Sequence, residues 1–280
     1  MTPLSSPSSS WQLSAESACH YLQTLSLKKQ LTSEDETFCE NACSLLKDEE
    51  AFSYFNNPLH YPWVLSQRHQ TALSWGHLNT LLEYYSVEKI WKSSLNYADF
   101  CSITNKHWLY GECHDLLNGE LDLLTPHPSL MCGKVCILGP GAVPYTGLAF
   151  LSAGAQVTFV DMFDGALTWC QRWVKRFFPL AQASYIHSSA QHIDYSSFDL
   201  VIIASMLTHK NEIFKKISLT PPHAILMRTT ENNRPLGLIE QMISPDDYMI
   251  LTPNYDLHST TNPPLSLANI SQLFLKKDGC

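Results

Sequence analysis

The chain has 280 residues, enough for one large or two modest domains, and its hydrophobic content of 45% is ordinary for a globular protein. Its formal net charge of −8 argues against a nucleic-acid-binding surface, because such a surface needs a basic stripe. No apolar run of about 20 residues is present, so we expect no membrane span and no membrane partner.

Residues 1–10 are rich in Ser and Pro and lack the basic and apolar regions of a signal peptide, so we expect a disordered tail. The nine cysteines include pairs four residues apart, such as Cys39 and Cys43, instead of the CxxC spacing of zinc sites. Buried free thiols in a reducing cytoplasm are the simpler interpretation. We therefore expect a cytoplasmic protein that holds no metal.

The first part of the chain, residues 11–128, is predicted to be mostly helical. Ser33 followed by Glu36 is a capping box that opens one helix. The segment 108–124 has apolar residues at helical spacing, and the two prolines in 125–128 predict a domain boundary after residue 128. Other helices are expected at 72–85 and, after a turn, at 87–95.

The second part, residues 129–280, alternates strands with helices, which predicts a mostly parallel, doubly wound α/β sheet. We expect strands at 135–138, 156–160, 183–187, 198–204 and 224–227, helices at 145–151, 163–178 and 211–217, and an edge hairpin from 248–251 and 272–275.

The glycine turn after the first of these strands is the most informative feature. Gly139-Pro140-Gly141 separates a buried strand from a helix, and the next strand ends in Asp161. Glycine tolerates positive φ and lets a ligand approach the backbone closely. A strand, a glycine-rich turn, a helix and a strand that ends in an acid form the nucleotide-binding half of a Rossmann-like fold, in which the acid binds ribose hydroxyls.

The residue at position 144 separates the ligand classes. The dinucleotide pattern G-x-G-x-x-G would need a glycine where this chain has Pro144, which argues against NAD and FAD. The proline suits a ligand without a pyrophosphate, and S-adenosylmethionine is the obvious one. A buried βαβ unit without any ligand is the structural alternative.

Four segments together resemble a known family. VCILGPGAVPYTG, VTFVDMFDGAL, FDLVIIASMLTH and ILMRTTENNRPLGLI resemble, in this order, a class I methyltransferase-like fold. More narrowly, they resemble the nicotianamine synthase family, including bacterial enzymes that make opine-type metallophores. The family turn G-S-G-P-x-P-x-T is matched by residues 139–146, and its D-x-D-x-x-A segment by Asp161 and Ala166, with Phe163 in place of the second acid.

Further matches lie within the fourth segment and before the first. The family pattern L-R-S-A-H-G-x-R is matched over residues 227–234, where Arg228 and Arg234 are kept and the middle differs. The pattern L-E-F-D-L-L corresponds to residues 119–124 and includes Glu120, and P-Y-Y corresponds to residues that end in Tyr110. The resemblance covers about residues 105–277.

The resemblance implies an unusual use of S-adenosylmethionine. The amine of an amino-acid substrate attacks the γ-carbon of the aminobutyrate arm, and 5′-methylthioadenosine leaves. The sulfonium activates all three attached carbons, so positioning decides which of them reacts. The resemblance therefore implies a 3-amino-3-carboxypropyl (aminobutyrate) transferase in metallophore biosynthesis.

These expectations assign roles to particular residues. A base must take the proton of the amine, for which Glu120 is the first candidate, and Tyr110 and Tyr145 could orient the amine. Arg228 and Arg234 could pair bidentately with substrate carboxylates. A solvated acid, core aromatics and surface arginines are the structural alternatives. The residues expected to bind the cofactor are Gly139, Pro140, Gly141, Pro144, Asp161, Ala190, Gln191, Ala204 and Ser205.

Two other functions stay open at the level of sequence. A small-molecule methyltransferase shares the turn and Asp161, and a degenerate module would bind S-adenosylmethionine or a partner protein without turnover. Phe163 and the altered residues 230–233 keep the degenerate module open. The sequence does not identify the acceptor amine, and it leaves the oligomeric state open, a homodimer included.

Overall fold

The computed structural model of the chain describes residues 24–46 except 26 and 29, then residues 78, 80–204, 207, 210–230, 248–251 and 269–276. The chain divides into two compact units. One consists of residues 1–85 with 256–267, and the other of residues 86–255 with 268–280.

In the first unit, helix α2 (Ser33–Leu46) begins with a capping box one residue earlier than predicted. The N–H of Asp35 donates to Thr32 Oγ1 at 3.3 Å, and the N–H of Thr32 donates to the Asp35 carboxylate at 2.9 Å. Burial raises the pKa of Asp35, but hydrogen bonds from Lys28 and Thr32 outweigh burial and hold this pKa below its ordinary value. The cap is therefore formed by Thr32 and Asp35 instead of the predicted Ser33 and Glu36, and Lys28 also binds the Asp35 carboxylate at 2.8 Å.

The second unit begins within a helix, and further helices follow. Residues 80–93 form one continuous helix, so the turn expected before residue 87 is absent. Helix α5 (Tyr97–Lys106), which we did not predict, is capped by Asn96, whose side chain accepts from the N–H of Asp99 at 2.9 Å. Helices α6 (Gly111–Leu124) and α7 (Pro128–Cys132) follow, and α7 was also missed. Within the described residues, no helix has the length and apolar character needed to cross a membrane.

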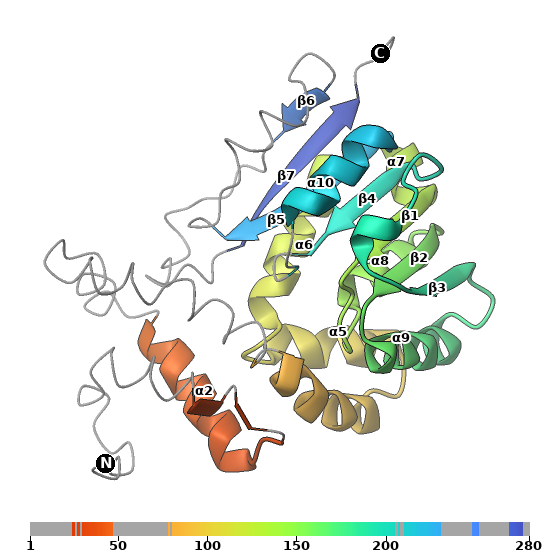
Figure 1. Ribbon diagram of the computed structural model, residues 1–280. Helices are drawn as coiled ribbons and strands as arrows, with labels where there is room; N and C mark the ends of the chain where they lie inside the picture. The colour runs from red at the N-terminus through yellow and green to blue at the C-terminus, as the bar shows by residue number, and fades with distance from the viewer. Residues whose placement is uncertain are drawn as a thin grey trace, which may run out of the picture. The chain divides into compact units, whose positions relative to one another are not determined.

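The sheet of the second unit has the strand order β3-β2-β1-β4-β5-β7-β6 (Figure 1). The first five strands of the chain are parallel, as predicted, so their carboxyl ends lie at one edge of the sheet. β7 pairs antiparallel with both β5 and β6, so the expected hairpin is joined to the sheet through β7. The strands are β1 (Lys134–Leu138), β2 (Gln156–Asp161), β3 (Ala183–His187), β4 (Leu200–Ile203), β5 (Ala224–Thr230), β6 (Tyr248–Leu251) and β7 (Asn269–Lys276).

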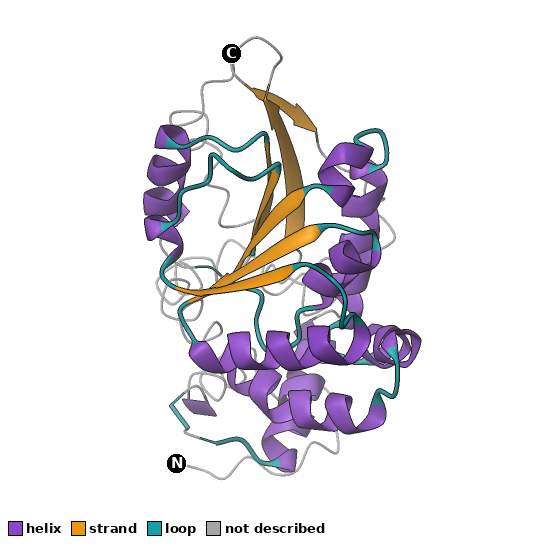
Figure 2. Ribbon diagram, turned by 90° about the vertical axis from the view of Figure 1, so that its right-hand side faces the viewer, coloured by secondary structure: helices purple, strands orange, loops and turns teal. Residues whose placement is uncertain are grey.

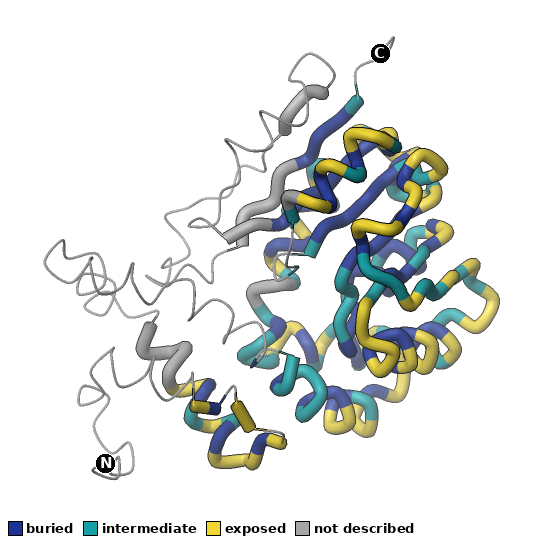
Figure 3. The backbone as a smooth tube through the Cα atoms, viewed as in Figure 1, coloured by how far each residue is buried: buried dark blue, intermediate teal, exposed yellow. Residues whose placement is uncertain are grey.

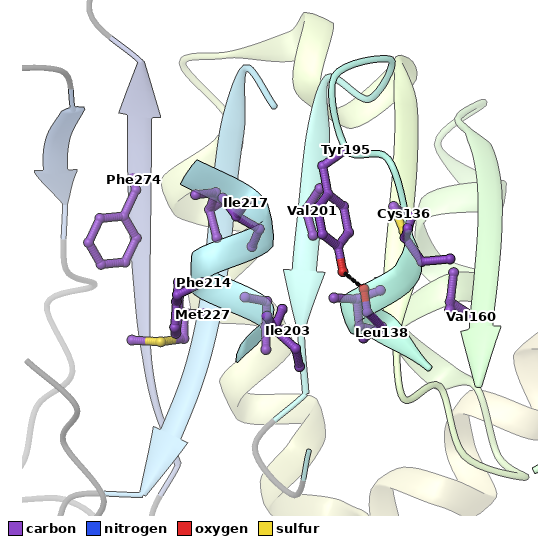
Figure 4. Close-up of a cluster of buried hydrophobic side chains, with 14 residues drawn as sticks. Cys136, Leu138, Val160, Tyr195, Val201, Ile203, Phe214, Ile217, Met227 and Phe274 are labelled. Atoms are coloured by element: carbon purple, nitrogen blue, oxygen red, sulfur yellow. Dashed lines mark hydrogen bonds between the residues drawn. The ribbon is translucent and has the colours of Figure 1, made fainter. Parts of the chain in front are cut away.

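Helices flank the sheet on both sides (Figure 2). Side chains alternate between the faces of a strand, so Cys136 and Leu138 face one layer and Ile137 the other. The first face packs in a buried cluster with Phe214 of α10 (Lys210–Leu219) and with Tyr195, which donates to the Ala190 carbonyl (Figure 4).

The other face of the sheet carries α8 (Tyr145–Ser152) and α9 (Asp164–Phe177). A Cβ added to Gly147 would lie 2.1 Å from Phe159 Cε1, so the helix and β2 are in close contact. The central strands β1 and β4 are buried along most of their length, whereas the edge strand β3 is partly exposed and α9 keeps one exposed side (Figure 3). These two layers fix the residues at the carboxyl edge.

Candidate functional site

The glycine turn lies at this carboxyl edge, between β1 and α8. Gly139 and Gly141 have φ of 71° and 68°, a region that other residues rarely adopt. A Cβ on Gly139 would lie 2.9 Å from Leu207 Cδ1, and the N–H of Gly139 donates to the Val160 carbonyl at 2.9 Å. The backbone conformation therefore favours glycine at residue 139.

Asp161 ends β2 beside the turn. Its Oδ1 accepts a hydrogen bond from the N–H of Phe163 at 2.9 Å. Burial raises the pKa of the Asp161 carboxyl, and hydrogen bonds from the backbone of Phe163, Gly141 and Met162 together with the nearby His187 only partly offset this rise. The carboxyl group thus connects the turn to the end of β2, at the place where folds of this type bind ribose hydroxyls.

Glu120 of α6 and Arg228 of β5 form a buried ion pair. Their side chains are 0% and 7% exposed. Arg228 Nε donates to Glu120 Oε1 at 2.7 Å, and Nη2 donates to Oε2 at 2.5 Å. This is a bidentate arrangement, which gives the strongest kind of charged hydrogen bonding. Removing one partner alone would take this bidentate contact from a buried charge, which is strongly destabilising.

Tyr145 is the third member of this cluster. Arg228 Nη1 donates to the Tyr145 hydroxyl at 3.3 Å, and the guanidinium carbon lies 5.7 Å from the centroid of the Tyr145 ring. Tyr145 is also the first residue of α8 and follows Pro144 of the turn. The structure therefore brings together three predicted site residues, Glu120, Tyr145 and Arg228. The guanidinium fork expected for a substrate carboxylate holds Glu120 here.

Tyr110 lies at the start of α6 and is buried. Its hydroxyl is 3.5 Å from Ser86 Oγ, and its ring centroid is 5.1 Å from that of His107. Tyr110 therefore links helix α6 to the helix of residues 80–93.

The remaining predicted residues lie in other segments of the same unit. Ala190 opens the short 3-10 helix η1 (Ala190–His192) and is buried, whereas Gln191 is exposed. Ala204 follows β4 and its N–H donates to the Leu138 carbonyl at 3.2 Å. Ser205 and Arg234 lie outside the described residues.

Two polar residues near the cluster were not predicted. His114 Nε2 lies 2.7 Å from Thr104 Oγ1, its ring centroid is 5.7 Å from that of Tyr145, and burial lowers the pKa of His114. Lys210 donates to the Arg228 carbonyl at 3.0 Å, and burial lowers the pKa of Lys210 to about 8. Neither residue belongs to a sequence motif. Lys210 opens α10, the helix that follows β4, and only this position could have indicated Lys210.

Neither a protein-family model nor a curated protein sequence matches the chain. Solved structures do match it. MtNAS, a nicotianamine synthase, in complex with MTA and tNA is 16% identical, with a TM-score of 0.62 over 94% of this chain and 97% of that chain. A mutant of MtNAS in complex with S-adenosylmethionine is also 16% identical, with a TM-score of 0.61 over 92% of this chain and 96% of that chain.

A second kind of protein is also similar. The magnesium protoporphyrin IX methyltransferase ChlM of Synechocystis PCC 6803 with bound SAH is 10% identical, with a TM-score of 0.48 over 71% of this chain and 99% of that chain. At these identities it is the fold that the likeness to MtNAS establishes. The chain has the Rossmann-like, class I methyltransferase-like fold that its sequence predicts.

Proposed function

We propose that the chain is an S-adenosylmethionine-dependent aminobutyrate transferase that acts on the amine of an amino acid. The observation that carries the proposal is the buried cluster of Glu120, Arg228 and Tyr145, next to the glycine turn and at the carboxyl edge of the sheet. The likeness in fold to MtNAS, crystallised with MTA and with S-adenosylmethionine, supports the same proposal.

The glycine turn and Asp161 would hold the nucleoside. Gly139 and Gly141 have positive φ and no side chain, so a ligand can approach the backbone closely. In the proposal, the Asp161 carboxylate accepts hydrogen bonds from the ribose hydroxyls. S-Adenosylmethionine supplies the reactive sulfonium carbon. The protein has to present the γ-carbon of the aminobutyrate arm, and not the methyl group, to the acceptor amine.

The Glu120–Arg228 pair suits a zwitterionic substrate. An α-amino acid carries one ammonium and one carboxylate. The pair likewise consists of one cation, the Arg228 guanidinium, and one carboxylate, that of Glu120. In our proposal the substrate exchanges partners with the pair, so that its carboxylate takes the Arg228 fork and its ammonium meets Glu120. Every buried charge keeps a partner during this exchange, which avoids the cost of an isolated one.

The transfer then needs one proton to leave the substrate. Glu120 accepts it from the ammonium, because only a neutral amine is a nucleophile. The C–N bond forms at the γ-carbon, the sulfur–γ-carbon bond breaks, and its electron pair remains on the sulfur of the departing 5′-methylthioadenosine. The product gains an amine and a carboxylate that can chelate a metal ion, which is our reason for proposing a role in metallophore biosynthesis.

Mass spectrometry of the nucleoside product tests the proposal. The purified protein is incubated with S-adenosylmethionine and a mixture of amino acids. We expect methylthioadenosine that forms only when amino acids are added, and the mass gain of one of them would identify the acceptor. S-Adenosylhomocysteine instead would make the chain a methyltransferase, and cofactor binding with neither product would favour a module without turnover.

A further inference from the structure

Helix α9 contacts the back of the glycine turn through one buried tryptophan. Trp173 is 0% exposed, and its Nε1–H donates to the Ala142 carbonyl at 3.1 Å. The Cys170 thiol, one turn earlier on the same helix, lies 3.5 Å from the carbonyl of Gly141. Two successive carbonyls of the turn are therefore held from the side of α9.

This contact matters because the glycines of the turn lose much conformational entropy when the turn is fixed. Gly139 and Gly141 both have positive φ, and glycine loses more conformational freedom on folding than any other residue. A peptide unit that could rotate would carry its N–H and C=O away from any ligand. The bond from Trp173 fixes the Ala142 carbonyl and so limits that rotation.

The indole cannot turn away from Ala142 without repacking its neighbours. The ring centroid of Trp173 lies 4.7 Å from that of Trp91 and 5.0 Å from that of Phe100 in α5. Arg176 of α9 lies over the Trp91 ring at 4.1 Å and donates to the Trp91 carbonyl at 2.7 Å. Trp173 is thus packed against the helices that precede the sheet on one side and bonded to the turn that follows β1 on the other.

We propose that Trp173 is a positioning residue for the cofactor, which holds the Gly139–Pro144 turn in its binding conformation through the bond to Ala142. The inference rests on the proposed function, because it takes the turn to be the site of S-adenosylmethionine. It adds a residue that touches neither cofactor nor substrate and acts through the backbone of the turn.

Trp173→Phe tests the inference, because it removes the N–H donor and keeps an aromatic ring. We expect the Kd for S-adenosylmethionine, measured by calorimetry, to rise about threefold to tenfold, the effect of losing one neutral hydrogen bond. The KM for the cofactor should rise by the same factor, whereas kcat at saturation should stay within about twofold. The matched control is Trp169→Phe, which makes the same change on the same helix. The ring of Trp169 lies 4.0 Å from the guanidinium carbon of Arg172.

A second measurement uses the unaltered protein. The indole N–H signal of Trp173 in a nitrogen-15 spectrum should move when S-adenosylmethionine is added, and that of Trp169 should move less. Equal Kd values for the wild type and Trp173→Phe, or a Trp173 signal that does not respond, would overturn the inference alone. A wild-type protein that does not bind S-adenosylmethionine would overturn the proposed function and this inference with it.

Discussion

Glu120 and Arg228 form a buried, bidentate ion pair. Arg228→Met removes the bidentate cationic partner of the buried Glu120 carboxylate, and we expect this to lower the free energy of unfolding by about 3–5 kcal/mol. The double variant Glu120→Leu with Arg228→Met should recover most of that loss, because both charges of the pair are then removed together, yet it should form no methylthioadenosine. Urea unfolding and the product assay measure the two effects.

The exposed pair of Glu88 and Lys92 provides the control. Its atoms are 3.6 Å apart on the surface of one helix, so Lys92→Met should change stability by less than about 0.5 kcal/mol. If the losses from Glu120→Leu and Arg228→Met simply added in the double variant, the two side chains would not be coupled and the exchange of partners proposed above would lose its basis.

Asp161 leads to a prediction about pH. The pKa of Asp161 is raised above 3.8 by burial, so its carboxyl takes up a proton at a higher pH than an exposed aspartate does. Because the ionised form is the better acceptor for ribose hydroxyls, affinity for S-adenosylmethionine should be full above the folded pKa and fall as pH drops through it. Asp161→Asn should weaken binding about 10-fold to 100-fold at neutral pH and lose this dependence.

Calorimetry at a series of pH values, from neutral pH downward, measures this dependence. The control is Asp164→Asn, an exposed acid in the first turn of α9, which should leave both the affinity and its pH dependence unchanged. A dependence that survives in Asp161→Asn would assign the titration to another group.

At the scale of elements, the contact between α8 and β2 depends on Gly147. A Cβ there would overlap the ring of Phe159, which is stacked on Tyr185 with a centroid distance of 5.5 Å. Gly147→Ala should therefore push α8 away from the sheet and cost about 1–3 kcal/mol of stability. Because α8 starts at Tyr145, cofactor affinity should fall as well.

Adding Phe159→Leu makes room for the new methyl group, so the double variant should bind the cofactor better than Gly147→Ala alone. Gly154→Ala separates sterics from strain, because no atom lies within 4 Å of its Cβ although φ is 93°. A Gly154→Ala variant that loses as much cofactor affinity as Gly147→Ala would count against the contact with Phe159 as the cause.

Helix α2 provides a second test at this scale. Thr32→Ala removes the side-chain acceptor for the N–H of Asp35, and we expect a loss of about 1 kcal/mol, while Thr32→Ser should retain most of the stability. Ser33→Ala should have almost no effect, although Ser33 is the residue that the sequence pattern favours. Equal effects of the two alanine variants in thermal unfolding would contradict the cap seen in the structure.

For the whole molecule, the sequence predicts best what depends on short-range pattern. The parallel strands, the positive φ of the glycine turn and the placement of Asp161 follow from buried runs and from the special backbone of glycine. Helix α5 was missed because its signal is a single capping residue, Asn96. The pairing of Glu120 with Arg228 could not be predicted, because 108 residues separate them and only the folded sheet brings them together.

The division into two compact units leads to a last prediction. If the units unfold separately, a ligand that binds only the unit of the sheet should raise only its transition. S-Adenosylmethionine at about 100 times Kd adds ~2.7 kcal/mol, which corresponds to a shift of roughly 5–10 °C. Thr32→Ala should lower only the other transition in the same calorimetric scan. A single transition that moves with both changes would mean that the two units unfold as one.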